Sequence, residues 1–449
     1  MSPNWCGLRS LRTRTYERAF VRLELSVVHI TRVRFADVTA VERSVLSINR
    51  QELEAQLKQD TRLADVAIEL ANPGDKCRIV NVADIIEPRA RTANSGPDFP
   101  GAVGRQGTAG HGSTCVLRGA AVLINDYNTG GRRYQRPDEG IIDMWGPGAE
   151  VGPYGKTCNV VVLASPANGT DIDDYCVALK IAGLKTAVYL AKAGAELTPD
   201  DVEIYDIPPI RHTAGELPDL PRVAYIFQVF SNQRVPLPGD PVLYGLHIDK
   251  IVPTILHPNE VFDGAVTDPY RGYAATYLIQ NHPMINELYR NHGKTLYFAG
   301  VIISNAPNNA PEYERTANVA ANLAKWVLGA DGAVLTKIGG GAPELTMAQT
   351  ALRCEELGVR TTLALAHQGI DATETTLKAS TVFSNIAQVD AMVSMGATTA
   401  SPMLTLPAAE KIIGALEDSQ TGAEIRRPAS DIKGSFSQLG DSDLMAVRY

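Results

Sequence analysis

The most promising chemistry in this 449-residue sequence lies in a loop that carries three consecutive glycines. The loop runs from Lys337 to Glu344 and reads KIGGGAPE. Glycines let backbone amides approach a ligand closely, and Pro343 suits the first turn of a following helix, whose N-terminus attracts anions. The loop has neither the spacing of a dinucleotide motif nor the lysine of a P-loop. It predicts either a simple turn or a ligand loop, with Gly340, Gly341 and Glu344 at the ligand.

A second group of candidates lies in a predicted helix. Arg315 and Asn318 fall near the start of the helix predicted over 312–328. An arginine at this place could bind a carboxylate through two parallel hydrogen bonds. The alternative is a surface ion pair with Glu312 or Glu314, which would contribute little to stability.

Four histidines are further candidates for proton transfer, because the imidazole titrates near neutrality. They are His257, His282, His292 and His367. For each of them the alternative is a structural hydrogen bond.

Alternating strands and helices predict how the glycine loop and the polar helix are positioned. Strands are predicted over 295–304, 332–336, 360–366 and 392–395, and helices over 312–328, 343–357, 379–388 and 407–415. This order is typical of a Rossmann-like, doubly wound and mostly parallel sheet, in which ligands bind beyond the carboxyl ends of the strands. The rule selects the loops 305–311, 337–344 and 367–373.

The N-terminal part is predicted to form another α/β lobe. Its strands are expected over 21–35, 41–48, 66–70, 157–164, 185–191, 202–205 and 222–231, and its helices over 50–58 and 171–182. Continuous apolar strands that alternate with helices indicate a parallel sheet covered on both faces. A glycine-rich segment, 94–112, is predicted as a long loop, either functional or a plain connector. The sequence thus predicts two α/β lobes, 21–265 and 266–449, after an extension or mispredicted start at 1–20.

Composition excludes two classes of partner. The formal net charge of −8 argues against broad nucleic-acid binding, which needs a basic surface. No apolar run reaches the roughly 18 residues of a membrane-spanning helix, so we expect a soluble, cytoplasmic protein. Six cysteines are scattered without the paired spacing of a metal site, and we expect reduced thiols and no metal.

Separated motifs, taken together and in order, carry a family resemblance. They are VRLEL at 21–25, DIIEPR at 84–89, FPG at 99–101, EGIIDMWGP at 139–147, GLK at 183–185, PDLPRV at 218–223 and EVFDGA at 260–265. With these motifs the chain resembles the substrate-binding subunit of component B of the glycine, sarcosine and betaine reductases. The resemblance runs from about residue 21 to the C-terminus.

The resemblance implies a subunit of an amine reductase complex. In this family the chain is a proprotein that cleaves itself before an internal cysteine, whose remnant becomes a pyruvoyl cofactor. The pyruvoyl carbonyl condenses with the substrate amine, and the resulting iminium lets a selenolate or thiolate displace the nitrogen. The implied partner is a reductase subunit that carries selenocysteine or cysteine, in a hetero-oligomer.

The segment that corresponds to the family's processing site departs from this pattern. It runs from Asp263 to Pro283, reads DGAVTDPYRGYAATYLIQNHP, and holds no Cys and no Ser. Its hydroxyl nucleophiles of the serine or threonine kind are Thr267 and Thr276, and a threonine would give a ketobutyryl group instead of pyruvoyl. We therefore expect a divergent member that stays uncleaved and has no pyruvoyl cofactor.

The resemblance also bears on the candidate site residues. Positions that match the family are Gly341, Pro343 and Glu344 in the glycine loop and Glu314, Arg315 and Asn318 in the polar helix. An amino-acid substrate would require a carboxylate-binding group such as Arg315. His282 lies in a family histidine region, so we select it as the catalytic candidate.

Three functions remain compatible with the sequence. The first is a substrate-binding subunit for reductive cleavage of a carbon–nitrogen or related bond, where a carbonyl-free mechanism would suit a quaternary ammonium leaving group. The second is a non-catalytic assembly subunit. The third is a small-molecule binding protein that uses the cleft between its lobes. A neighbouring gene for a partner with selenocysteine or a reactive cysteine would favour the first.

Overall fold

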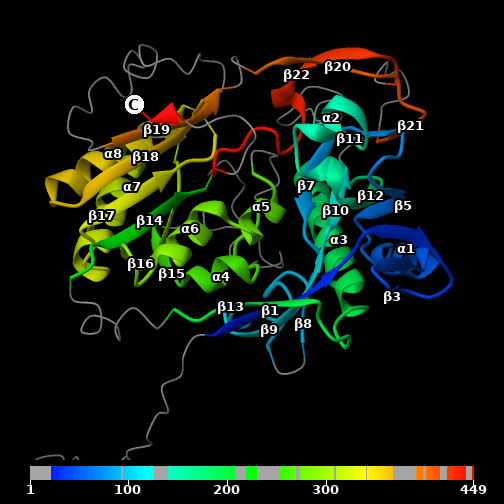
Figure 1. Cartoon of the computed structure of the whole chain (residues 1–449), viewed down its shortest axis with the longest axis horizontal. Helices are drawn as coiled ribbons and strands as arrows, with labels where there is room; N and C mark the ends of the chain where they lie inside the picture. Colours follow the sequence, from blue (N-terminus) through cyan, green and yellow to red (C-terminus); the bar gives the residue numbers. More distant parts are fainter. Residues whose placement is uncertain are drawn as a thin grey trace, which may run out of the picture.

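The structure is a computed structural model of the chain, shown in Figure 1. It describes residues 22–92, 95–125, 140–207, 219–229, 252–268, 274–307, 310–339, 341–367, 391–397, 401–414, 422–440 and 447–448. These residues form a mixed α/β fold with several sheets, which confirms the predicted class. The predicted extension at 1–20 and the predicted helix over 379–388 lie outside the described residues.

The first strands belong to two small sheets. One has the spatial order β13 (Asp201–Tyr205), β1 (Leu23–His29), β9 (Gly112–Arg118) and β8 (Arg89–Arg91). The other consists of β2 (Arg32–Phe35), β4 (Val45–Ile48) and β3 (Ala40–Glu42). The strand predicted over 21–35 is therefore two strands in different sheets. The strand predicted over 41–48 is a hairpin, since Arg43 and Ser44 at its turn have positive φ.

A second four-stranded sheet forms the main N-terminal core. Its spatial order is β5 (Leu63–Ala71), β12 (Cys158–Pro166), β10 (Ala120–Asn125) and β7 (Val82–Ile86). Only β10 and β12 are parallel, because both outer strands run antiparallel to their neighbours. The prediction of a parallel sheet here is wrong. The helices α1 (Arg50–Leu57) and α3 (Ile172–Lys192) share its hydrophobic core (Figure 1).

The strand predicted over 185–191 is also wrong, because these residues form the second half of α3. Most of α3 is buried, so its sequence lacks the polar face that normally reveals a helix. Ala, Leu and Lys nevertheless favour the helical state. Asp171 caps the helix by accepting a hydrogen bond from the backbone N–H of Asp173.

The C-terminal part is built on a seven-stranded sheet. Its spatial order is β15 (Thr254–Leu256), β16 (Tyr297–Ser304), β14 (Arg222–Gln228), β17 (Gly332–Thr336), β18 (Arg360–His367), β19 (Ala391–Ala397) and β23 (Val447–Arg448). The five central strands are parallel and the two edge strands antiparallel. The carboxyl ends of the central strands therefore meet at one edge of the sheet, which occupies the left half of Figure 1.

Helices cover both faces of this sheet. One face packs on α7 (Ala310–Asn322), the π-helical turn at Leu323–Val327 and α8 (Ala342–Glu356). The other face packs on α4 (Pro258–Phe262), α5 (Thr276–Gln280) and α6 (Pro283–Asn291). Alternate residues of each strand enter the two cores: Ile226 of β14 faces α7 and α8, whereas Tyr225 and Phe227 face α4 to α6.

Late residues of the chain complete early sheets. The helix predicted over 407–415 is wrong, because Lys411–Ile413 forms strand β21 and pairs with β6 (Cys77–Ile79), which also pairs with β11 (Ile142–Asp143). Pairing with a distant strand here overrides local preference. A separate pair joins β20 (Met403–Leu406) to β22 (Ile425–Pro428). Short helices are α2 (Gly146–Glu150) and the 3-10 turns Tyr154–Lys156 and Ala429–Asp431.

The predicted division at residue 265 stays a prediction. β14 precedes this boundary but lies in the C-terminal sheet, and β21 follows it but pairs with β6. In the described ranges, no helix combines the length and apolar character that crossing a membrane requires.

Candidate functional site

A buried triad fixes the segment 263–283 to the N-terminal core. Asp84 of β7 accepts hydrogen bonds from the backbone N–H of Thr276 at 2.8 Å and from the Thr276 hydroxyl at 2.7 Å. Lys180 of α3 forms an ion pair with Asp84 and donates a hydrogen bond to the same hydroxyl at 2.8 Å. All three side chains are almost fully buried. A buried charge is tolerated only when it is paired, so these groups depend on one another.

Arg89 of β8 binds the same segment through its guanidinium. It forms an ion pair with Glu87 at 2.5 Å and donates hydrogen bonds to the backbone carbonyls of Phe262 at 2.5 Å and Gln280 at 3.2 Å. Burial by itself would raise the pKa of Glu87, but the neighbouring guanidinium groups outweigh burial and the pKa is lowered. The carboxylate is therefore charged and holds Arg89 in place.

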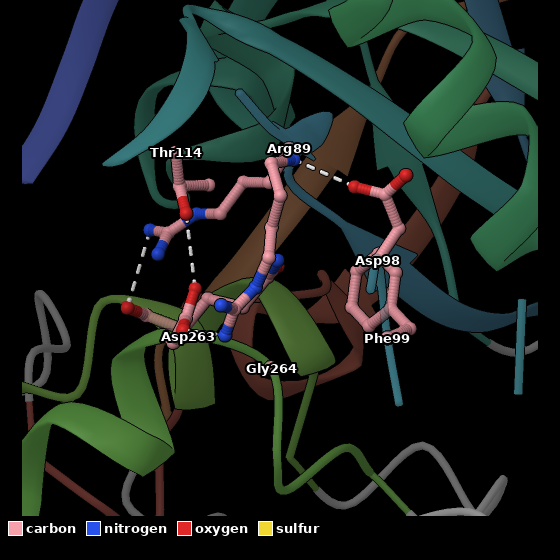
Figure 2. A pocket seen from close by; sticks show the side chains of 8 residues that line it. Arg89, Asp98, Phe99, Thr114, Asp263 and Gly264 are labelled. Carbon is pink, nitrogen blue, oxygen red and sulfur yellow. Dashed lines mark hydrogen bonds and ion pairs between the residues drawn. The ribbon is translucent and has the colours of Figure 1, made fainter. Parts of the chain in front are cut away.

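A small pocket lies beside this network (Figure 2). It is lined by Arg89, Arg91, Asp98, Phe99, Thr114, Asp263, Gly264 and Gln280. Asp263 accepts hydrogen bonds from the Thr114 hydroxyl at 3.0 Å and from the backbone N–H of Gly110 at 2.6 Å, and it forms an ion pair with Arg91. Burial raises the pKa of Asp263 even though Arg91 acts in the opposite direction.

The glycine-rich segment 94–112 contributes one wall of the pocket. Phe99 in this segment has a φ of 34°, which is unusual for a residue with a side chain. A Cβ added to Gly264 would lie 2.9 Å from the Phe99 ring, so only glycine fits there. The described part of the segment thus packs directly on the start of the processing segment. Its role in ligand binding stays a prediction.

The residues around the pocket do not fit a pyruvoyl precursor. Of the two threonines in the segment, Thr276 is already held by Asp84 and Lys180. Thr267 is buried, and its hydroxyl has no hydrogen-bond partner among the described residues. Neither side chain is a cysteine or a serine. The network therefore positions the segment, and we derive no step through a pyruvoyl group.

The glycine loop lies at the carboxyl end of β17 and begins α8. The buried Lys337 ammonium donates a hydrogen bond to the Gly339 carbonyl at 2.8 Å and pairs with Glu344 at 3.2 Å. Burial lowers the pKa of Lys337, although Glu344 opposes this shift. Gly341 has a φ of 76° and is the N-cap of α8 without a side-chain cap. Gly340 lies outside the described residues.

Arg315 and Asn318 lie on the exposed side of α7. Within the described parts of the chain, Arg315 has no ion pair with Glu312 or Glu314, which the sequence offers as the alternative to a ligand role. No hydrogen bond among the described residues joins Arg315 or Asn318 to the glycine loop. The structure thus brings Lys337, Gly341 and Glu344 together and leaves the two α7 residues at the surface.

His282 is fully buried at the start of α6. Its Nε2 lies 3.1 Å from the Tyr225 hydroxyl, and its ring packs edge-on against Tyr225 and Phe227. Its Nδ1 has no hydrogen-bond partner in the part of the chain that the structure describes. Burial lowers the pKa of His282 to about 3, so the imidazole is neutral near pH 7. His257 caps α4, and burial lowers its pKa to about 4.

Four of the described cysteines are poor nucleophiles in this fold. They are Cys77, Cys115, Cys158 and Cys354, which are buried free thiols; Cys176 is buried as well. Burial raises the pKa of Cys115 and Cys158 to about 11 and that of Cys77 and Cys354 to about 12. A thiol with such a pKa is protonated near neutrality and reacts slowly. Among the described residues, no group of three or more His, Cys, Asp or Glu side chains could hold a metal ion.

Comparison with known proteins decides the family. A family model described as glycine/sarcosine/betaine reductase component B subunits matches residues 21–431. The chain belongs to this family. It is 37% identical to the glycine reductase complex component B subunits alpha and beta of Acetoanaerobium sticklandii, over 96% of this chain and 100% of that relative. No solved structure matches the chain.

Relatives with other substrate names match as well. The sarcosine reductase complex component B subunit alpha of Peptoclostridium acidaminophilum is 34% identical, over 95% of this chain and 96% of the relative. The betaine reductase complex component B subunit alpha of the same organism is 32% identical, over 76% of this chain and 77% of the relative. The predicted family is confirmed, and component B is a part of multi-protein reductase complexes.

Sequence reasoning missed most of the buried network. Asp84, Glu87 and Arg89 belong to the DIIEPR motif, which served only to indicate the family. Lys180 and Arg91 gave no signal, because each is an ordinary charged residue until the fold buries it. The feature that could have indicated the network is the presence of two acids and two arginines in an otherwise mostly apolar stretch, 82–91.

Proposed function

We propose that this chain is the substrate-binding subunit of a reductase complex that cleaves a carbon–nitrogen or related bond of a small amine-type substrate, without a pyruvoyl group. The single observation that carries the proposal is the processing segment: a member of this family has neither Cys nor Ser from 263 to 283. A substrate whose nitrogen is already activated, such as a quaternary ammonium, would not need a carbonyl to form an iminium.

The nucleophile comes from a partner subunit that carries selenocysteine or cysteine. Burial raises the pKa of Cys77, Cys115, Cys158 and Cys354, which supports a nucleophile that is supplied by another subunit. The subunits form a hetero-oligomer, in which this chain binds and orients the substrate.

The substrate binds at the carboxyl edge of the C-terminal sheet. Its parallel strands follow the order β16, β14, β17, β18 and β19, which supports a doubly wound, Rossmann-like arrangement with a site near the ends of β14 and β17. The proposed ligand residues are Arg315, Asn318, Gly340, Gly341 and Glu344. His282, on the face of the sheet that packs against α4 to α6, takes part in its neutral form as a hydrogen-bonding group.

Thiol consumption tests the proposal. The isolated chain, given betaine, sarcosine or glycine together with a dithiol, should consume no thiol, whereas the complex with its partner should. Consumption by the isolated chain that disappears in Cys115→Ala or Cys158→Ala would overturn the proposed supply of the nucleophile by a partner. A complex that turns over none of the three compounds would favour an assembly subunit or a binding protein.

A further inference from the structure

Three neighbouring strands of the C-terminal sheet end in a row of polar side chains. Gln228 of β14 is in register with Ser304 of β16. On its other side, Phe227 is in register with Thr336, the last residue of β17, and Lys337 follows Thr336 as Gln228 follows Phe227. Residues in register across parallel strands point to the same face of the sheet. Ser304, Gln228 and Lys337 thus form one row across the carboxyl edge, called the polar row below.

The polar row interrupts an apolar face. Two residues earlier, the equivalent row consists of Ile302, Ile226 and Leu335, which pack in the core against α7 and α8. Packing against α7 and α8 thus favours apolar side chains on this face of the sheet. The change to serine, glutamine and lysine occurs where ligands bind in sheets of this strand order.

The polar row is buried but incompletely hydrogen-bonded. Ser304, Gln228 and Lys337 are 2%, 3% and 1% exposed. In the described part of the chain, the Ser304 hydroxyl and the Gln228 Oε1 have no hydrogen-bond partner. A buried polar atom without a partner destabilises the fold, so its presence needs an explanation. Gln438, whose Oε1 accepts a hydrogen bond from the Gly339 backbone N–H at 2.5 Å, has an unpartnered Nε2 as well.

The charge at this edge favours an anion. α7 and α8 follow β16 and β17, so the N-termini of these two helices of 13 and 15 residues lie at the same edge as the polar row. The first backbone N–H groups of α8 have no side-chain cap at Gly341. Helix N-termini attract negative charge, and the Lys337 ammonium adds a positive charge beside them. The Glu344 carboxylate offsets part of this charge.

We propose that Ser304, Gln228 and Lys337 form the floor of a binding site for a small organic carboxylate. The Ser304 hydroxyl and the Lys337 ammonium donate hydrogen bonds to the carboxylate oxygens, and Gln228, whose unpartnered Oε1 is an acceptor, faces the part of the molecule away from the carboxylate. The inference rests on the proposed function, because it supplies recognition residues at the strand ends where the substrate is placed. In this proposal the substrate carboxylate is bound by three buried side chains and not by the exposed Arg315 alone.

The first test is the stability of the ligand-free chain. Ser304→Ala removes the unpartnered hydroxyl and Gln228→Met removes the side-chain amide whose Oε1 is unpartnered, so the full chain should melt at the same temperature or a higher one. Ser435→Ala is the matched control, because the Ser435 hydroxyl is buried and donates to the Ala429 and Ile432 carbonyls at 2.5 and 2.8 Å. The control should melt lower. A clear loss of stability in both test variants would mean that these groups serve the fold, and would overturn the proposal.

The second test measures binding of sodium acetate and of betaine to the full chain by broadening of the ligand NMR signals. Both carboxylates should bind, and tetramethylammonium chloride, which lacks a carboxylate, should not. Ser304→Ala and Lys337→Met should weaken binding by about tenfold or more, whereas Ser435→Ala should not. Absence of binding by both carboxylates, or unchanged affinity in both test variants, would refute the site. The measurement needs neither the partner nor an uncleaved chain, so its outcome is separate from that of the proposed function.

Discussion

Buried charges in this chain are concentrated where the processing segment meets the N-terminal core. Asp84, Lys180 and Thr276 come from a strand, a long helix and the segment itself, and each satisfies the hydrogen bonds of the others. Arg91 and Asp263 repeat the arrangement at the start of the segment. If the segment were cut, such a network would hold both sides of the cut; if it stays uncut, as we propose, the network holds both ends of one continuous backbone.

Lys180→Met tests how much the triad contributes to folding. The variant leaves Asp84 buried without its ion partner, and we expect the free energy of unfolding to fall by about 3 kcal/mol or more. Lys192→Met on the same helix is the control, since Lys192 is largely exposed and its pair with Asp98 spans 3.8 Å. Urea denaturation of both variants and of the parent chain measures the change in the free energy of unfolding. Equal, small losses would show that the triad is not a structural anchor.

The low pKa of His282 predicts a pH dependence of stability. In the unfolded chain a histidine takes up a proton near pH 6.5, whereas buried His282 stays neutral down to a pKa of about 3. The unfolded state therefore binds more protons between these values, and stability falls as the pH falls through this window. Between pH 7.5 and 5 the loss from this residue is about 2 kcal/mol.

His282→Gln removes the titrating group while keeping a neutral polar side chain. Urea midpoints at pH 7.5 and pH 5 should differ less in the variant than in the parent chain. The comparison cancels any uniform cost of the substitution. An identical pH dependence in the two proteins would contradict a buried, neutral His282.

At the scale of elements, the start of α8 and the exposed side of α7 form the two halves of the proposed ligand edge. Gly341 has a positive φ and open space beyond its Cα, so a larger residue there is strained by its backbone and not by a clash. Arg315 sits on α7 with its side chain exposed. A substitution at Gly341 should therefore act on folding, and one at Arg315 on binding.

Arg315→Lys and Gly341→Val separate these two effects. Arg315→Lys keeps the charge but loses the planar guanidinium; we expect betaine binding to weaken by about 1–3 kcal/mol with an unchanged melting temperature. Gly341→Val should lower the melting temperature through its φ of 76°. Calorimetric titration measures betaine binding, and thermal melting of the same samples measures stability. Parent-like betaine binding by Arg315→Lys would remove Arg315 from the site.

Local sequence patterns predicted several elements well and failed where distant residues decide. The strand at 332–336 was predicted with its observed bounds, because apolar residues there are flanked by glycine and a polar loop. The second half of α3 was mistaken for a strand, since burial on nearly all sides hides the helical period. β21 forms only because β6 lies beside it. The polar row and the buried triad depend on register and on contacts between residues 76 or more positions apart, which no local pattern encodes.

The whole molecule joins its sheets through segments that cross between them. β21 extends the sheet of β6, and the described part of the processing segment packs between the N-terminal core and the C-terminal sheet through α5. A cut inside that segment would leave two fragments held together by the buried network alone. An uncut segment makes the link covalent, which is the arrangement expected when no cysteine or serine is present to start the reaction.

The intact mass of each polypeptide in the natively purified complex tests the central claim most directly. Acid must be avoided, because the Asp268–Pro269 bond is prone to acid cleavage and would imitate processing. We predict one continuous polypeptide across residues 263–283 with no hydrazine-reactive terminus, alongside a partner chain that contains selenocysteine or a reactive cysteine. Two fragments that meet between Asp263 and Pro283, with a carbonyl at the new terminus that reacts with a hydrazine probe, would contradict the account.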